Sequence, residues 1–185
     1  MTMLMAGMVL FFGTHLVPNI AGVRTGLVNG IGEKTYMSMY AILSLVGITL
    51  MFVGRSRADF ELLWVAPGWL KIVTMIFMFA SFYCLLAMFM PTNVKKWVHH
   101  PMLTFMLLFG VGHLLSNGDV AALVFFGSLA IFSLFKIVSL SKRAPAESFA
   151  GVSLGKDLIV LASTFVVYIA VIYMHPYLAN GASVF

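Results

Sequence analysis

The sequence predicts an all-α fold, a polytopic bundle of about six transmembrane helices that forms one membrane domain over residues 1–185. Three observations lead to this prediction. Of the 185 residues, 62% are apolar and 9% are charged, whereas a soluble domain has about 45–50% and about 25%. The apolar residues gather into six runs of roughly span length, and basic residues fall between these runs. A soluble fold could not bury this much apolar surface, so we expect the chain to be surrounded by a lipid bilayer.

The six apolar runs are residues 3–17, 36–53, 69–90, 101–116, 120–140 and 158–174. A span needs about 20 apolar residues, with a range of roughly 17–25, so the first and fourth runs are the shortest candidates. No positively charged segment precedes the first run, and no small-residue cleavage motif follows it. We therefore expect this run to be a span and not a cleaved signal peptide.

Two connections carry structure of their own. Residues 19–35 have apolar side chains at helical spacing, with Arg24 and Lys34 off that face, which predicts a helix lying along the cytoplasmic interface. Residues 116–119 contain Asn-Gly, which favours a tight turn, and Asp119 is placed to cap the helix that follows.

The basic residues indicate the topology. The connections after the first, third and fifth runs contain most of them: Arg24, Lys34, Lys95, Lys96, Lys136, Lys142, Arg143 and Lys156. The opposite side has only Arg55, Arg57 and Lys71. The positive-inside rule then predicts a bacterial inner-membrane protein with both termini in the periplasm. The net charge of +5 thus marks topology, and we expect no nucleic-acid partner.

Histidines are the candidate functional residues, because an ionisable side chain at membrane depth usually has a function. His99, His100 and His175 lie near the ends of predicted spans. His15 and His113 each lie about 12 residues into a span, or about 18 Å from the edge where that span starts. In a hydrocarbon core about 30 Å thick, both positions fall near the midplane.

Two imidazoles at matched depth on different helices are what bis-histidine ligation of a haem iron requires. Phenylalanines and glycines near both residues would suit a flat macrocycle. The alternative is that each histidine is hydrogen-bonded to a neighbouring helix and that the glycines serve helix packing. Asn117 lies four residues after His113, so its side chain is placed either to hold that imidazole, to face a pocket, or to form the turn.

A set of short motifs runs from the first span to the turn after the fourth. They are His15; Arg24; Gly32-Glu33; Tyr36; Tyr40; Ser44-Leu45-x-Gly47; His100-Pro101-Met102-Leu103; His113-Leu114-Leu115; and Asn117-Gly118-Asp119. In this order they resemble the NnrU family of bacterial integral membrane proteins, with the likeness strongest over residues 5–143.

The resemblance implies a role in denitrification, through nitrite and nitric oxide metabolism. The family is also similar to the plant 15-cis-zeta-carotene isomerase, a membrane enzyme with haem b. Its ligand histidines match His15 and His113, and its His-Pro motif matches His100-Pro101. This implies haem b as cofactor, with nitric oxide or a hydrophobic small molecule such as a polyene as ligand. Where that enzyme has a cysteine proposed to take part in a ligand switch, this chain has Gly110.

Basic residues near the predicted cytoplasmic face, among them Arg24 and His100, are candidates to pair with haem propionates or lipid headgroups. They are also ordinary positive-inside residues, which is the simpler interpretation.

Two other functions are compatible with the sequence. His100-Pro101 beside a basic face looks like the Arg-His-Pro motif of small integral-membrane methyltransferases and sterol reductases. Here His99 takes the place of the arginine, and no acidic residue follows within the span. A non-catalytic assembly or regulatory partner of another membrane protein is the third hypothesis, because no general acid, base or nucleophile stands out. The sequence leaves open whether the chain is an enzyme.

Overall fold

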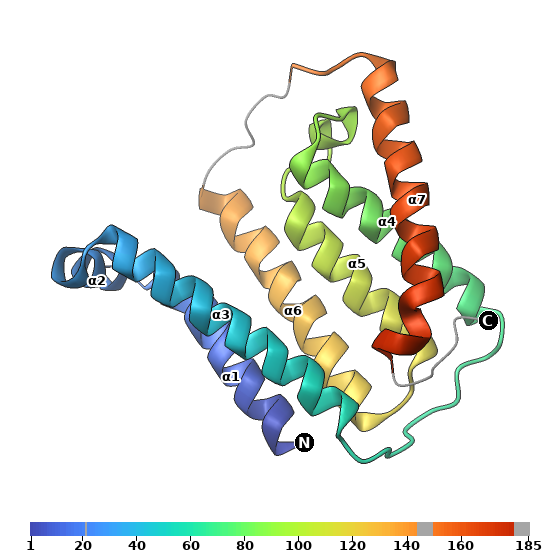
Figure 1. Cartoon of the computed structure of the whole chain (residues 1–185), viewed down its shortest axis with the longest axis horizontal. Helices are drawn as coiled ribbons and strands as arrows, with labels where there is room; N and C mark the ends of the chain where they lie inside the picture. Colours follow the sequence, from blue (N-terminus) through green and yellow to red (C-terminus); the bar gives the residue numbers. More distant parts are fainter. Residues whose placement is uncertain (21, 144–149, 180–185) are drawn as a thin grey trace. The chain divides into compact units, whose positions relative to one another are not determined.

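The computed structural model describes residues 1–20, 22–143 and 150–179, which are almost entirely helical (Figure 1). None of the described residues forms a strand, apart from an isolated antiparallel bridge between Leu62 and Asp119. The chain divides into two compact units, Met1–Phe60 and Glu61–Phe185, which we describe separately. The prediction that the C-terminus is periplasmic concerns residues 180–185, which lie outside the described residues.

In the first unit, α1 (Thr2–Leu16) continues into the 3₁₀ turn η1 (Val17–Asn19). The short helix α2 (Val23–Ile31) follows, and α3 (Glu33–Ser56) runs back along α1 (Figure 1). Gly22 and Gly32 flank α2 with φ angles of +78° and +81°, a left-handed backbone that glycine adopts without strain. The predicted helix between the first two spans is therefore present.

Glycines set the contact between α1 and α3. A Cβ atom built on Gly54 would lie 2.3 Å from the backbone nitrogen of Leu4, and one on Gly47 would lie 2.8 Å from that of Phe11. A Cβ on Gly7 would lie 2.6 Å from the backbone nitrogen of Met51. The two backbones can approach this closely only because these positions have no side chain, as is common between helices in membranes.

The second unit contains four long or apolar helices: α4 (Leu70–Phe89), α5 (Pro101–Ser116), α6 (Val120–Arg143) and α7 (Leu154–Leu178). The 3₁₀ turn η2 (Asn93–Lys96) lies between α4 and α5. Helix α5 packs against both α4 and α6, and α7 packs against α4.

Hydrogen bonds between helices hold the second unit together. The Thr74 hydroxyl of α4 donates to the carbonyl of Gly112 on α5 at 3.0 Å, and the Ser81 hydroxyl donates to the carbonyl of Phe105 at 3.1 Å. From α7, the Tyr168 hydroxyl donates to the carbonyl of Met75 at 3.0 Å.

The turn between α5 and α6 forms as predicted. The Asp119 carboxylate accepts from the backbone N–H of Ala122 at 2.9 Å, so it caps α6. The Gly118 carbonyl accepts from the N–H groups of Leu63 and Trp64, which ties the extended segment before α4 to this turn. A Cβ on Gly118 would overlap the Trp64 carbonyl oxygen, so glycine is required there.

At the opposite end of the second unit, a polar cluster joins the connection after α4 to the start of α7. The Asp157 carboxylate accepts from the Thr92 hydroxyl at 2.7 Å and from the backbone N–H of Asn93 at 2.8 Å. His100 lies 3.3 Å from the Ser141 hydroxyl near the end of α6. The basic residues of these connections thus gather at one end of the unit, as alternating spans require.

All six apolar runs coincide with helices, which confirms the all-α polytopic fold. Among the described residues, five helical stretches are long and apolar enough to cross a membrane, the first of them being α1 together with η1, Thr2–Asn19. Helix α5, with 16 residues, is shorter. Large apolar side chains face outward along these helices; for example, Leu45 is 66% exposed and Ile131 is 72% exposed. Such surfaces are stable only in contact with lipid or another apolar partner. The chain is a multi-pass membrane protein.

Candidate functional site

His15 is held by its own helix near the end of α1. Its Nδ1 lies 2.8 Å from the carbonyl oxygen of Phe11, four residues earlier. The Phe11 and His15 rings are 4.3 Å apart between centroids. Because His15 lies on the same stripe of α1 as Leu4, Gly7 and Phe11, it belongs to the face that meets α3.

His113 repeats this arrangement in α5. Its Nδ1 lies 3.0 Å from the carbonyl oxygen of Phe109, again four residues earlier, and the two rings are 4.3 Å apart. A carbonyl oxygen can only accept, so in a neutral ring the proton is on Nδ1 and the lone pair is on Nε2. In this tautomer Nε2 is the ring nitrogen that could donate to a metal in each histidine.

The surroundings of His15 are partly polar. The Tyr40 ring on α3 lies 5.2 Å from the His15 ring, and the Tyr36 ring lies 6.3 Å from that of Tyr40. The Arg24 guanidinium is 5.8 Å from the Tyr36 ring centroid and 3.5 Å from the Glu33 carboxylate. Arg24, the two tyrosines and His15 thus form a continuous line of contacts within the first unit.

The surroundings of His113 are aromatic. The Phe126 ring on α6 stacks on the His113 ring, with centroids 4.4 Å apart and planes 16° apart. The His175 ring on α7 lies 6.5 Å from it, at an interplanar angle of 23°. A Cβ on Gly110 would lie 2.6 Å from the Phe126 carbonyl oxygen, so α6 occupies the space that a side chain at this position would need.

Asn117 contacts the backbone of His113 and not its ring. Both its Nδ2 and its backbone N–H donate to the His113 carbonyl oxygen, at 2.8 and 2.9 Å. This closes the last turn of α5, so of the alternatives from the sequence, the structure shows the turn-forming contact. A role for Asn117 in cofactor binding stays a prediction.

His100 is remote from His113, because it precedes α5 and lies about 20 Å along the helix axis from that residue. Among the described residues, no three His, Cys, Asp or Glu side chains gather as they would around a metal ion. His15 and Arg24 belong to the first unit, whereas His100, His113 and Asn117 belong to the second. Their association in one cofactor site stays a prediction.

His15 lies one residue before the end of α1, and His113 lies three residues before the end of α5. The sequence estimate placed both near the middle of a span. Tyr40, which is beside His15, is about 10 Å from the start of α3, and Phe126, which is beside His113, is about 9 Å from the start of α6. The estimate from the sequence assumed spans of standard length, whereas α1 and α5 are both short. Matched depth at the midplane stays a prediction.

Sequence reasoning missed two features of these sites. It placed His175 at the interface and did not associate it with His113. It also overlooked that both histidines occur in the same pattern, Phe-x-x-x-His-Leu-x-x-Asn, at residues 11–19 and 109–117. That recurrence was the available signal, because i and i+4 residues lie on one face of a helix.

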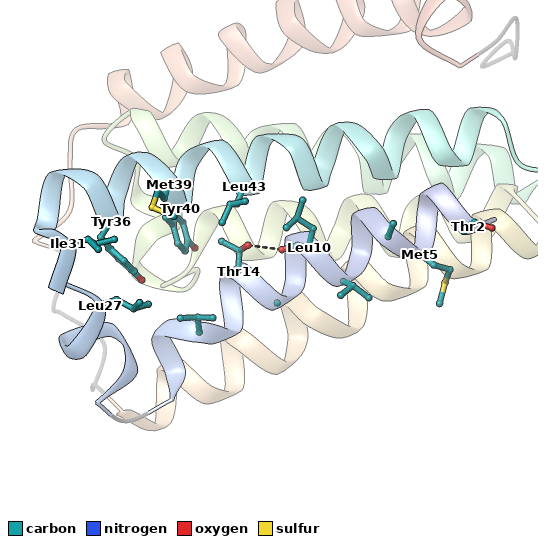
Figure 2. Close-up of a pocket in the computed structure, with 14 residues that line it drawn as sticks. Thr2, Met5, Leu10, Thr14, Leu27, Ile31, Tyr36, Met39, Tyr40 and Leu43 are labelled. Carbon is teal, nitrogen blue, oxygen red and sulfur yellow. Dashed lines mark hydrogen bonds between the residues drawn. The ribbon is translucent and has the colours of Figure 1, made fainter. Parts of the chain in front are cut away.

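The first unit also contains an apolar groove of about 760 Å³ (Figure 2). Residues of α1 from Thr2 to Thr14, with Val17 of η1, form one wall, and residues of α3 from Tyr36 to Leu43 form the other. Leu27 and Ile31 of α2 close one end. Figure 2 shows the Tyr36 and Tyr40 side chains near that end, and the hydrogen bond of 2.7 Å from the Thr14 hydroxyl to the Leu10 carbonyl.

Comparison with known proteins identifies the family. Residues 3–182 match the NnrU family, described as NnrU protein, which is nearly the whole chain. No curated protein and no solved structure matches this chain. The paired Phe-x-x-x-His helices are thus features of a multi-pass membrane protein that belongs to the NnrU family.

Proposed function

We propose that this chain binds haem b in the bacterial inner membrane, that His15 and His113 would hold it, and that it acts in nitrite or nitric oxide metabolism. The observation that carries the proposal is the hydrogen bond from Nδ1 of each imidazole to the carbonyl four residues earlier. Metal-bound histidines generally donate their other ring N–H in this way, which fixes both the tautomer and the orientation of the ring.

The residues present fit haem b. The donor set is two neutral imidazoles, which are common axial ligands of haem iron, and each has an aromatic neighbour in its own helix. Haem b held by these ligands would supply an iron that transfers single electrons and takes nitric oxide as a ligand.

The chain's own contribution is orientation and the exclusion of water. The carbonyls of Phe11 and Phe109 hold the Nδ1 protons and so keep Nε2 of each ring as the donor to a metal. Phe126 covers one face of the His113 ring, which shields that imidazole from water. Apolar surroundings of this kind would limit the access of solvent to a bound metal and so affect its reduction potential.

The space at Gly110 argues against a cysteine-based ligand switch of the kind proposed for the plant isomerase. A thiol at this position would require α5 and α6 to separate, because its Cβ would lie 2.6 Å from the Phe126 carbonyl oxygen. A cysteine-based ligand switch therefore has no place here, and the proposal does not include one.

The test is the absorption spectrum and the pyridine haemochrome content of the detergent-purified protein, produced with ample haem supply. We expect close to one haem per chain in the wild type and loss of haem in both His15→Ala and His113→Ala. His99→Ala is the matched control, because His99 is exposed and lies before α5, and it should retain the wild-type content.

Two results would overturn the proposal. One is well-folded wild-type protein without haem, as judged by circular dichroism. The other is full haem content in either His15→Ala or His113→Ala, which would exclude that residue as a ligand.

A further inference from the structure

The groove between α1, α2 and α3 has the size and shape of a site for a single hydrocarbon chain (Figure 2). Its volume of about 760 Å³ falls within the usual range of small-molecule sites, roughly 300–1,000 Å³. It follows α1 from Thr2 and reaches Val17 at the start of η1, a distance of about 22 Å at the helical rise. One leaflet of a bilayer contributes about 15 Å of hydrocarbon, so a long acyl chain can occupy the groove along its length.

The lining excludes a polar occupant. Apart from two threonines and two tyrosines, every lining residue is apolar, and none is charged. One of these hydroxyls, that of Thr14, is already bonded to the Leu10 carbonyl of its own helix. A ligand with hydrogen-bonding groups along its length would leave most of them without partners inside the groove, which is unfavourable in an apolar environment.

Positive charge is found at the α2 end of the groove. The Arg24 guanidinium lies 5.8 Å from the ring centroid of Tyr36, which lines the groove, and Lys34 is in the first turn of α3. Glu33 offsets one of these charges through an ion pair of 3.5 Å. The Arg24 and Glu33 side chains are 49% and 69% exposed, so their ion pair contributes little to stability. A phosphate can therefore compete with Glu33 for the Arg24 guanidinium.

We propose that this groove binds an anionic phospholipid, with one acyl chain between α1 and α3 and the phosphate at Arg24 and Lys34. The assignment does not depend on haem, because His15 is not among the residues that line the groove, although Tyr40, which does line it, lies beside His15. It also accounts for α2, a helix of nine residues that has no buried side chain and flanks the groove. Basic clusters at the cytoplasmic ends of membrane helices recognise anionic headgroups by this combination of charge and apolar contact.

The experiment uses the full chain in nanodiscs of equal parts dioleoylphosphatidylglycerol and dioleoylphosphatidylcholine, followed by native mass spectrometry of the lipids retained. We expect the wild type to retain one phosphatidylglycerol in preference to phosphatidylcholine. Gly13→Leu should fill the groove, because Gly13 lines it and a Cβ there meets nothing within 4 Å, and retention of both lipids should fall. Gly26→Leu is the matched control, since Gly26 has equally open space but does not line the groove.

A second pair of variants tests the headgroup. Arg24→Gln should reduce the preference for phosphatidylglycerol about fivefold, the usual effect of one basic residue at an anionic surface. Arg57→Gln, at the other end of α3, should leave the preference unchanged. If Gly13→Leu does not fold, Ala6→Leu fills the same groove from about two turns nearer the N-terminus of α1.

Three outcomes would overturn the assignment. The first is equal retention of both lipids by the wild type. The second is unchanged retention in both groove-filling variants. The third is recovery of a neutral apolar molecule, such as a quinone or a polyene, in place of phospholipid. Haem content has no bearing on any of these outcomes, so this inference and the proposed function can fail separately.

Discussion

The two helix pairs that carry the histidines, α1 with α3 and α5 with α6, have the same local chemistry in different settings. In both pairs the histidine follows a phenylalanine by four residues, and its Nδ1 is bonded to that residue's carbonyl. The partner helix then supplies an aromatic ring, Tyr40 in the first pair and Phe126 in the second.

The pairs differ in how their helices meet. Between α1 and α3, glycines on both helices bring the backbones together at Gly7, Gly47 and Gly54. Between α5 and α6, the close approach is at Gly110 on α5, and large rings fill the rest. One pair is therefore a backbone contact beside an open groove, whereas the other is an aromatic contact that encloses its histidine.

The orientation of each imidazole and the environment of its ring therefore have separate origins. Orientation comes from the helix itself, since an i to i−4 side-chain bond needs no partner helix. The environment comes from the neighbouring helix, which is tyrosine-rich in the first unit and phenylalanine-rich in the second. Substitutions in the contacts should therefore change stability differently in the two pairs without changing the histidine rotamer.

The largest effect is expected at the backbone contact. In Gly54→Ala, the new Cβ would lie 2.3 Å from the backbone nitrogen of Leu4, so α1 must move. We expect a loss of about 2–3 kcal/mol in the free energy of unfolding, the upper part of the range of about 1–3 kcal/mol found for overpacked cores. Unfolding by sodium dodecyl sulfate in mixed micelles, followed by circular dichroism, measures it.

Gly127→Ala is the control for this change, because its Cβ would meet the side chains of Leu123 and Leu114 only at 3.8–3.9 Å. Helix propensity alone should then make this variant equal to the wild type or more stable by up to about 1 kcal/mol. If Gly54→Ala unfolds at the same detergent concentration as Gly127→Ala, the α1–α3 contact is not the backbone contact described above.

The positions of the helices could be predicted from the sequence. Run length and hydropathy located every span, and the Asn-Gly turn and the Asp119 cap followed from local chemistry alone. The helix at Val23–Ile31 was also predictable from its apolar residues at helical spacing, although it is shorter than the predicted segment, residues 19–35.

Contacts between helices were beyond sequence reasoning, because apolar runs in a membrane do not specify which faces meet. Nothing in the last span indicates that His175 lies 6.5 Å from His113, since that depends on how α7 packs on α4. The sequence also left open whether Asn117 bonds to the backbone of His113 or to its ring, because both are within reach of a side chain four residues later. Spacing shows which local contacts are possible, but it does not show which helices pair.

An intermediate effect is expected at the aromatic contact. Phe126→Leu removes the ring stacked on His113 while keeping an apolar side chain, and we expect a loss of about 1.5 kcal/mol. Tyr40→Leu removes a ring that is tilted by 57° and lies 5.2 Å away, so its effect should be smaller, about 0.5 kcal/mol. The same detergent titration compares the two. Equal losses would mean that both histidines have equivalent aromatic neighbours, which contradicts the difference between the pairs.

The smallest effect is expected where a hydroxyl joins two helices. Thr74→Val removes the bond from α4 to the Gly112 carbonyl and the contact of 2.6 Å with the Ser116 hydroxyl, both within one turn of His113. Hydrogen bonds between membrane helices contribute about 0.6 kcal/mol on average, so we expect a loss of about that size.

Thr14→Val is the matched change in the first unit, where the hydroxyl bonds to the Leu10 carbonyl of its own helix. Because valine keeps the shape of threonine and that carbonyl retains its helical partner, Thr14→Val should be neutral. A loss in Thr14→Val as large as that in Thr74→Val would show that the bond between helices adds nothing beyond a local one, and that α4 does not hold the last turn of α5 in place.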